Sequence, residues 1–222
     1  MILAFETATD VCSVAFQDKL GGVHEKRIEG RGVHSANVFL FSQALMKEHQ
    51  FSISDLEAVL VSIGPGSYTG LRIGVSAIKG LLFGLNTNLY AINTLVGFAQ
   101  SQVDNAKGNH IHSIIDARRT HLYHQKFSVL NGLVEDSEPS LVEIVDFESE
   151  LDNGDIVVGT GLSRLGNMQN KEVTLCGSEY ISATNLIHLF NAQPDAPFFI
   201  KTSLEALNPN YITSNQVNNS TA

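Results

Sequence analysis

One glycine-rich loop constrains the fold of this chain more than any other feature. It consists of Gly64, Pro65, Gly66, Ser67, Tyr68, Thr69 and Gly70. The apolar run before it, at 58–63, is typical of a buried parallel strand, and apolar residues recur at helical spacing over 71–85. Glycine permits backbone angles and close approaches that a Cβ forbids, and Ser67 or Thr69 can cap the helix. The segment therefore predicts a strand, a tight turn and a helix in succession.

The loop allows two interpretations. A helix start can hold an anion, because free N–H groups and the helix dipole point at the loop; a turn that only packs explains the same residues. A Walker A loop is excluded because no Lys follows Gly70. A dinucleotide fingerprint needs its third glycine at position 69, which is Thr, and no Asp or Glu occurs between 58 and 103 to bind a ribose.

The segments around the loop predict a ribonuclease H-like unit. Apolar runs at 2–5 and 11–16 predict a hairpin, and an alternating run at 23–28 predicts a third strand. Helices are expected over 34–49, from position 70 and from Thr94 through 103, with strands at 58–63 and 89–92. Three antiparallel strands followed by alternating helices and parallel strands are the pattern of that unit.

The second half opens as the first does. A strand at 111–115 ends in Asp116, as the first strand ends in Glu6, and a strand at 122–129 follows. This internal echo predicts an α/β fold of two ribonuclease H-like subdomains, the duplicated architecture of actin and the sugar kinases. We expect a first subdomain over 1–104, a degenerate second over 105–210 and a loose tail over 211–222. Further strands are expected at 141–145, 156–158 and 173–176, and a helix at 184–191.

Charge and composition narrow the function. The net charge is −9, and residues 135–155 hold nine acidic side chains and no Lys or Arg. A chain this acidic is a poor candidate for binding tRNA unaided, because phosphate affinity rests on Lys and Arg. The acidic stretch is either a solvated face or a surface for a basic partner. With no signal peptide, no membrane span and two isolated cysteines, Cys12 and Cys176, the sequence predicts a cytoplasmic protein.

Three motifs carry a resemblance to a known family. The segments 64–74 (GPGSYTGLRIG), 2–9 (ILAFETAT) and 116–119 (DARR) resemble TsaB, formerly YeaZ, the bacterial accessory protein of tRNA threonylcarbamoyladenosine synthesis. The resemblance covers most of residues 1–125. The resemblance implies that the chain is a non-catalytic scaffold without a cofactor and that it activates the transferase TsaD. It also implies that the chain forms a homodimer when TsaD is absent. Together with the ATPase TsaE, that machinery modifies adenosine 37, so this chain would meet tRNA only through the complex.

Several residues argue against catalysis by this chain. TsaD transferases bind a metal through two histidines one helical turn apart; His34 matches the first, but Val38 stands in the second position. One histidine cannot supply the usual ligand set, so we expect His34 to start the helix and Ser35 to cap it. ATP-binding relatives carry glycines in two hairpin turns, and here the turns at 7–9 and 117–119 have none.

Two enzymatic alternatives stay open. Glu6, Asp10 and Asp116 could hold a metal for an actin-like kinase or ATPase. If Asp116 pairs with Thr120 across the second hairpin, His112 faces His124 with His110 alongside, which would suit a zinc-dependent hydrolase. Arg118 either pairs locally with Glu6 or Asp116 or binds an anion or a partner. The candidate site residues in the motif loops are therefore Glu6, Thr7, residues 64–69, Asp116 and Arg118.

The helices of the first half are the expected partner surface. Gly70 and Gly74 are four apart, as are Gly80 and Gly84, so another helix could approach closely. The alternative is internal packing of that glycine side against the helix at 34–49. The resemblance implies that these helices pair with TsaD, and we expect the interface to involve His34, Ser35, Val38, Phe41, Leu45, Gly70, Arg72, Gly74, Ala77, Ile78 and Leu81. One departure is Thr213, which stands where the family pattern Pro-x-Tyr-Leu-Arg ends in Arg.

Overall fold

The computed structural model describes residues 1–166 and 171–212, which form two six-stranded sheets. The first sheet has the order β12-β5-β4-β1-β2-β3; the second has the order β11-β10-β6-β7-β8, with β9 also paired to β7. The strands are β1 Ile2–Glu6, β2 Val11–Gln17, β3 Val23–Glu29, β4 Ala58–Gly64, β5 Asn88–Asn93, β6 Ile111–Asp116, β7 His121–Val129, β8 Leu133–Glu135, β9 Ser140–Glu143, β10 Ile156–Gly159, β11 Thr174–Cys176 and β12 Ile200–Thr202.

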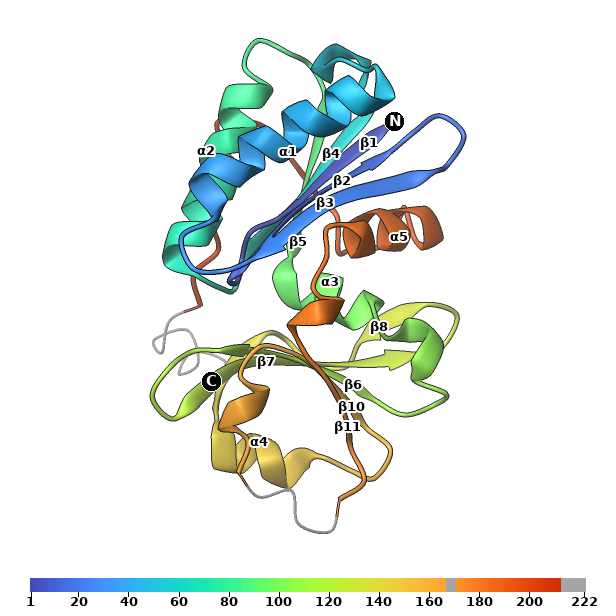
Figure 1. Cartoon of the computed structure of the whole chain (residues 1–222). Helices are drawn as coiled ribbons and strands as arrows, with labels where there is room; N and C mark the ends of the chain where they lie inside the picture. Colours follow the sequence, from blue (N-terminus) through green and yellow to red (C-terminus); the bar gives the residue numbers. More distant parts are fainter. Residues whose placement is uncertain (167–170, 213–222) are drawn as a thin grey trace.

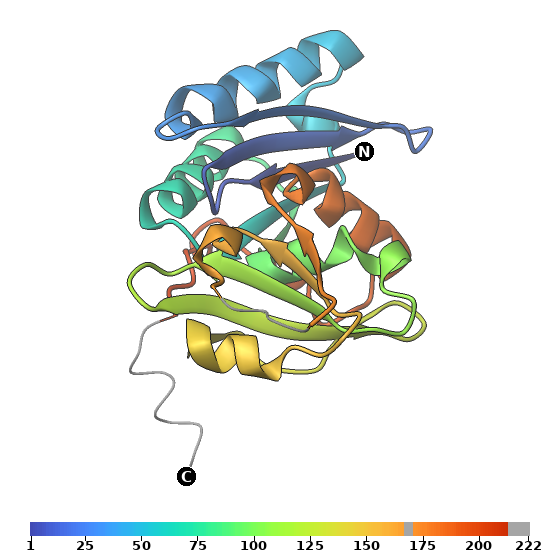
Figure 2. The same cartoon turned by 60° about the horizontal axis from the view of Figure 1, so that its bottom comes forward.

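Five α-helices of the described residues cover the sheets. They are α1 His34–His49, α2 Tyr68–Leu81, α3 Thr94–Gln100, α4 Ile144–Glu150 and α5 Thr184–Ala192. Helices α1 and α2 lie on the outer face of the first sheet, and α3 and α5 lie between the two sheets (Figure 1). Figure 2 shows α1 and α4 on opposite outer sides of the molecule. None of the helices in the described ranges combines the length and apolar character that a membrane span requires.

A small buried apolar cluster that includes Phe147 packs α4 on the second sheet, and two larger clusters hold the rest of the described residues together. One packs the outer face of the first sheet against α1 and α2, through residues such as Phe5, Leu45 and Ile78. The other fills the space between the sheets and includes Phe98 and Leu186. Both sheets share one core layer, because α3 and α5 present apolar side chains to each side.

The predicted fold class is confirmed. The strands around β1–β5, the hairpin β6–β7 and the helices α1, α2, α3 and α5 lie close to their expected positions. The expected strand at 141–145 is wrong in its second half, where α4 begins at Ile144, and β12 was not predicted. The division at 104/105 stays a prediction; β12 comes from the later part of the chain but completes the first sheet by pairing with β5. Residues 213–222 of the expected tail, with Thr213, lie outside the described residues.

The expected cap of α1 is also wrong. Val33 occupies the N-cap position, and no side chain caps the helix. His34 is buried instead, and its Nε2 lies 3.1 Å from the carbonyl oxygen of Val11 on β2. This imidazole therefore ties the start of α1 to the first sheet.

Candidate functional site

The glycine-rich loop after β4 is locked from two sides. The amide of Ser67 donates to the carbonyl of Ala8 at 2.6 Å, and a Cβ on Gly66 would collide with that carbonyl. On the other side, a Cβ on Gly64 would collide with the carbonyl of Asn210, and Gly64 has a φ of +126°. The Ser67 hydroxyl accepts from the amide of Gly70 at 3.3 Å, which confirms one of the two predicted caps. The loop therefore fixes the start of α2 against the β1–β2 turn.

Glu6 also helps to fix the β1–β2 turn, and it does not line the cleft that is described below. Its side chain is buried and accepts hydrogen bonds from the amide of Ala8 at 2.7 Å and from the hydroxyl of Ser62. Burial raises the pKa of the Glu6 carboxyl to about 7. The carboxyl thus closes the β1–β2 turn over β4, and both of its oxygens are engaged.

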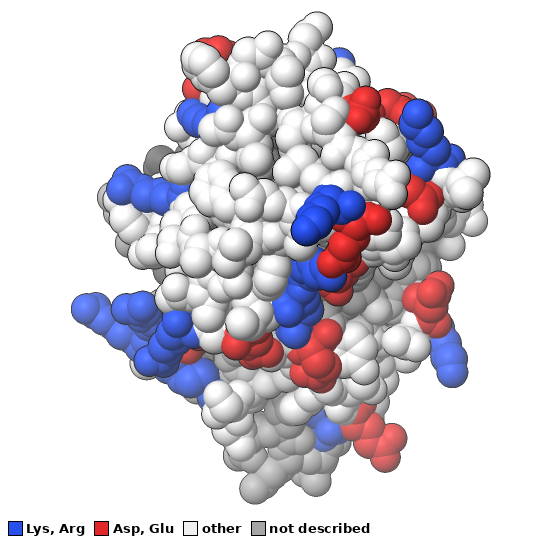
Figure 3. Space-filling view, turned by 45° about the horizontal axis from the view of Figure 1, so that its top comes forward, with Lys and Arg blue, Asp and Glu red and all other residues white. Residues whose placement is uncertain are grey.

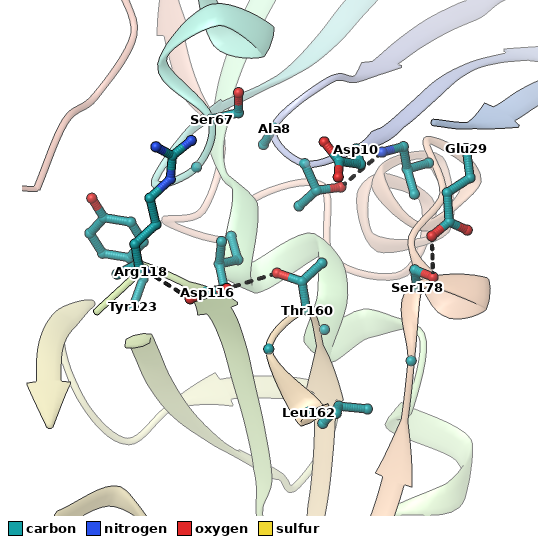
Figure 4. Close-up of a pocket in the computed structure, with 18 of the residues that line it drawn as sticks. Ala8, Asp10, Glu29, Ser67, Asp116, Arg118, Tyr123, Thr160, Leu162 and Ser178 are labelled. Carbon is teal, nitrogen blue, oxygen red and sulfur yellow. Dashed lines mark hydrogen bonds between the residues drawn. The ribbon is translucent and has the colours of Figure 1, made fainter. Parts of the chain in front are cut away.

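A cleft of about 1120 Å³ lies between the two halves, at the ends of their strands. Figure 4 shows Asp10 and Ser67 on one side, the β6–β7 hairpin with Asp116 and Arg118 on another, and Thr160 below. The cleft is lined mainly by polar and small residues, among them Ala8, Thr9, Glu29, Arg31, Gly66, Thr69, Gly159, Gly161, Ser163, Gly177 and Ser178. Such a cleft offers backbone and hydroxyl groups to a small polar ligand.

The loop after β10 is a part of this cleft that the sequence reasoning missed. Gly159 and Gly161 have φ values of +132° and +90°, and a Cβ on Gly159 would collide with the carbonyl of Ile114. The hydroxyl of Thr160 accepts from the amide of Asp116 at 3.1 Å. The signal available in the sequence was a Gly-Thr-Gly directly after a short apolar run.

Asp116 is engaged by neighbouring groups. Its Oδ1 accepts from Arg164 Nη1 and from the amide of Arg118, both at 2.8 Å. Arg118 therefore meets Asp116 through its backbone, and the guanidinium that pairs with Asp116 belongs to Arg164. The side chain of Arg118 extends from the hairpin turn toward Ser67 (Figure 4). Arg118 and Arg119 both have positive φ, +68° and +51°, within the short turn that connects β6 and β7.

One side of the cleft is tied across the two halves. Arg27 on β3 donates to the carbonyls of Ser178 at 2.7 Å and Ile181 at 3.0 Å. The hydroxyl of Ser178 donates to Glu29 at 2.6 Å, at the edge shown in Figure 4. These bonds hold the segment after β11 against the edge strand of the first sheet.

The histidines of the second hairpin come together in a register that differs from the expected one. Asp116 pairs with Leu122 and not with Thr120. The residue opposite His112 is therefore Lys126, two positions after the expected His124. A shift of two residues keeps both imidazoles on one face. Nδ1 of His112 lies 3.0 Å from Nε2 of His124, and the rings stack with centroids 5.2 Å apart.

This histidine pair is bonded to Asp155. Nε2 of His112 lies 3.1 Å from Asp155 Oδ2, and the more exposed His110 lies 3.6 Å from Oδ1. Because a carboxylate only accepts, His112 donates from Nε2 and accepts at Nδ1 from His124. Burial lowers the pKa of His112 to about 4 and that of His124 to about 3. Across residues 1–166 and 171–212, no group of three or more His, Cys, Asp or Glu side chains is arranged to hold a metal ion.

A second concavity, of about 470 Å³, lies between α1 and α2 and is called here the helical groove. It is lined by Ser35, Phe39, Tyr68, Thr69, Arg72, Ile73, Ser76 and Ala77. Phe39 and Tyr68 are 42% and 55% exposed, although both are large apolar-bodied side chains. The helices carry few charged residues, and the face that comes forward in Figure 3 has a broad area without charge.

An aromatic cluster forms one end of the helical groove. The guanidinium carbon of Arg72 lies 4.0 Å from the centre of the Tyr68 ring. Nε of Arg72 donates to the hydroxyl of Tyr211 at 3.3 Å, and the rings of Tyr68 and Tyr211 stack at 5.1 Å. Cation–π contact and stacking together hold these three side chains in place.

The expected interface residues divide by burial. Ser35 and Arg72 are exposed in the groove, Ala77 forms its floor, and Phe41 and Leu81 are half-buried. The others lie beneath the surface: His34, Val38, Leu45, Gly70, Gly74 and Ile78. The glycine side is not open at Gly70 and Gly74, because Thr7 fills that space. It is packed internally, but against the first hairpin and not against α1 as the alternative expected. Phe39, Ile73 and Ser76 were missed, although they lie opposite the apolar stripe that marks the buried side.

Comparisons with known proteins agree with this architecture. The family model "TsaD: tRNA N6-adenosine threonylcarbamoyltransferase" matches residues 11–156. The chain is 30% identical over 166 residues to the "tRNA threonylcarbamoyladenosine biosynthesis protein TsaB" of Escherichia coli K12, covering 72% of this chain and 71% of that protein. It is 31% identical over 142 residues to the Bacillus subtilis 168 protein of the same name, covering 62% of this chain and 59% of that protein. A solved structure, "YeaZ from Pseudomonas aeruginosa", superposes with a TM-score of 0.80 at 23% identity, covering 95% of this chain and 99% of that one.

Proposed function

The chain belongs to the TsaB (YeaZ) family, and we propose on this premise that it serves the biosynthesis of threonylcarbamoyladenosine in tRNA as an accessory subunit. Its role is to bind a TsaD-type transferase and hold it in an active arrangement. The transferase moves the threonylcarbamoyl group to adenosine 37, and this chain contributes no catalytic group. The observation that carries the proposal is the exposed helical groove between α1 and α2.

The choice of partner follows from the similarity between the two kinds of protein. A model of the transferase family matches residues 11–156 of this chain, which include both α1 and α2. Two related chains that carry the same pair of helices can pack them about a pseudo-two-fold axis, each filling the other's groove. The same geometry allows a homodimer when the transferase is absent. Exposed Phe39 and Tyr68 are the aromatic anchors that such an interface needs.

The state of the acidic residues supports an accessory role. Glu6 is buried and bonded to Ser62 and Ala8, and Asp116 is neutralised by Arg164. The first turn of the cleft has Ala8 and Thr9 where a phosphate-binding backbone needs glycine. His34 is hydrogen-bonded to the carbonyl of Val11, and the position four residues later, where the transferases have a second histidine, is Val38.

The remaining partners are proposed from the family resemblance and from the net charge of the chain. The ATPase TsaE completes the machinery. With a net charge of −9 this chain gains little from phosphates, so tRNA reaches it only within the complex.

Light scattering tests the proposal. The chain, the TsaD protein of the same organism and their mixture are measured separately, and the mixture is also assayed for threonylcarbamoyl transfer to tRNA. We expect a mixed complex that forms at the expense of self-association and that raises transfer. A mixture that shows neither a complex nor stimulation would overturn the proposal.

A second candidate function is nucleotide binding in the cleft. It is favoured by the cleft volume of about 1120 Å³ and by the Gly159-Thr160-Gly161 backbone on its wall. Calorimetric titration of the isolated chain with ATP distinguishes the two functions. Saturable binding would favour a nucleotide-dependent function, and no binding would favour the accessory function.

A further inference from the structure

The segment after β12 returns to the helical groove and is anchored there. Leu207 is buried in the apolar cluster under α1 and α2. The amide of Asn210 donates to the carbonyl of Ile63 at 2.6 Å, directly before the glycine-rich loop. These contacts place Tyr211 beside the first turn of α2, where its hydroxyl accepts from Arg72.

Arg72 is the one charged residue among those that line the helical groove. It is exposed, its guanidinium lies over the Tyr68 ring, and its Nε donates to the Tyr211 hydroxyl. Within the described ranges, no carboxylate pairs with it. A guanidinium that one ring and one hydroxyl hold in place still has N–H donors left for a carboxylate, whose two oxygens match them.

A second copy of this chain has no suitable carboxylate to offer. The chain contains no Asp or Glu between 58 and 103, so α2 of another copy carries none. Helix α1 contains a single acid, Glu48, which lies near its far end and is bonded to Lys26 at 2.8 Å. In a pairing between two copies, the guanidinium of Arg72 would therefore lose its hydration without gaining an ion pair with a carboxylate.

We propose that Arg72, positioned by Tyr211, makes the groove select a transferase whose facing helix carries a carboxylate over a second copy of this chain. This proposal rests on the proposed function and adds the chemistry that separates the two pairings. Arg72 supplies the charge, and Tyr211 is a positioning residue that acts through it. The apolar groove walls are common to both pairings, so the charged contact carries the discrimination.

Variants of Arg72 test the proposal through two separate affinities. The affinity for the transferase is measured by calorimetry, and self-association is measured by sedimentation equilibrium. We expect Arg72→Ala to weaken binding to the transferase by roughly tenfold or more, while self-association stays equal or becomes stronger. Raising the salt concentration should weaken the mixed pairing more than the self-pairing. Arg72→Gln, which keeps the length of the side chain, should behave as Arg72→Ala does.

The positioning role of Tyr211 is tested by combining its substitution with that of Arg72. Tyr211→Phe keeps the ring stack but removes the hydroxyl, and we expect it to weaken the mixed complex less than Arg72→Ala does. Added to Arg72→Ala, it should cause little further loss, because it acts through Arg72. Lys79→Ala is the matched control, since it removes a positive charge from the same helix outside the groove lining.

The outcomes separate the two proposals. If the unmodified chain does not bind the transferase, the proposed function fails. If it binds and Arg72→Ala changes both pairings equally, or Lys79→Ala does as much as Arg72→Ala, the selectivity of the groove has another origin and this inference is overturned. Additive losses for Arg72 and Tyr211 would remove the positioning role of Tyr211.

Discussion

The hydroxyl of Thr7 occupies the space into which a Cβ on Gly74 would project. Thr7 is buried in the β1–β2 turn, and its hydroxyl has no hydrogen-bond partner among the described residues. A Cβ on Gly70 would likewise collide with the carbonyl of Thr7. The four-residue spacing of these glycines on α2 therefore serves packing against the first hairpin, and the helical groove is lined by other residues of the same helix.

Two glycine substitutions separate packing from helix propensity. Gly74→Ala should lower the free energy of unfolding by about 1–3 kcal/mol, because the new methyl group overpacks the contact with Thr7. Gly80→Ala, at an exposed site with no atom within 4 Å of the added Cβ, should raise it by about 0.5–1 kcal/mol. Urea unfolding of both variants provides the comparison. Equal effects of the two changes would contradict the packing described here.

Local signals made the first half predictable. The strand β4, the loop and α2 follow from an apolar run, glycines and a serine cap that are adjacent in sequence, so no distant residue is needed to place them. Whether the glycine side of α2 stays open depends on Thr7, which lies far away in the sequence. The end of the groove depends on Tyr211, which is 139 residues from Arg72. A helical pattern shows which face is apolar but not what covers it.

The second hairpin shows the same limit in another form. Alternation placed His112 and His124 on one face, but the offset between the strands was wrong by two residues. A period of two fixes the face of a side chain and leaves the offset to the turn. Here the turn closes with Arg118 and Arg119 at positive φ, which neither residue type indicates in advance.

Glu6 should make stability depend on pH near neutrality. Burial raises the pKa of its carboxyl from 4.5 to about 7, so the folded chain holds this proton more tightly than the unfolded chain. Its favourable contribution is fully present below pH 4.5 and is lost as the pH rises through about 7. Glu6→Gln keeps an acceptor for Ala8 and a donor for Ser62, and at pH 8 it should be more stable than the wild type by roughly 2–3 kcal/mol.

The comparison is made by urea unfolding of both proteins at pH 5 and pH 8. Using the difference between the two proteins cancels the titration of all other groups. A difference that stays constant between the two pH values would show that Glu6 is already ionised at pH 5.

The stacked histidines should have the opposite effect in acid. The pKa values of His112 and His124 lie below 6.5, at about 4 and 3, so the unfolded chain takes up protons first as the pH falls. Their contribution is present above pH 6.5 and is lost as the pH falls toward 4. His124→Gln should be less stable at pH 7, since it loses contact with Phe147, and should show a shallower decline between pH 6.5 and 4.

His188→Gln is the matched control, because His188 is an exposed histidine on α5. It should leave both the stability at pH 7 and the acid decline close to those of the wild type. A decline that His188→Gln reduces as much as His124→Gln would place the acid sensitivity outside the stacked pair.

A negative charge placed at Phe39 in the helical groove should weaken pairing without unfolding the chain. Phe39 is 42% exposed and lines the groove, so Phe39→Glu sets a carboxylate on an apolar contact and should weaken the complex with the transferase by at least roughly tenfold. Val145→Glu makes the same change on α4, at a side chain that is 64% exposed and outside the groove, and should leave affinity unaltered. Because both sites already face water, neither variant should lower the melting temperature by more than about 2–4 °C. Calorimetric titration with the transferase then locates the interface: a loss confined to Phe39→Glu places it on α1 and α2, and a loss confined to Val145→Glu would move it to the outer face of the second sheet.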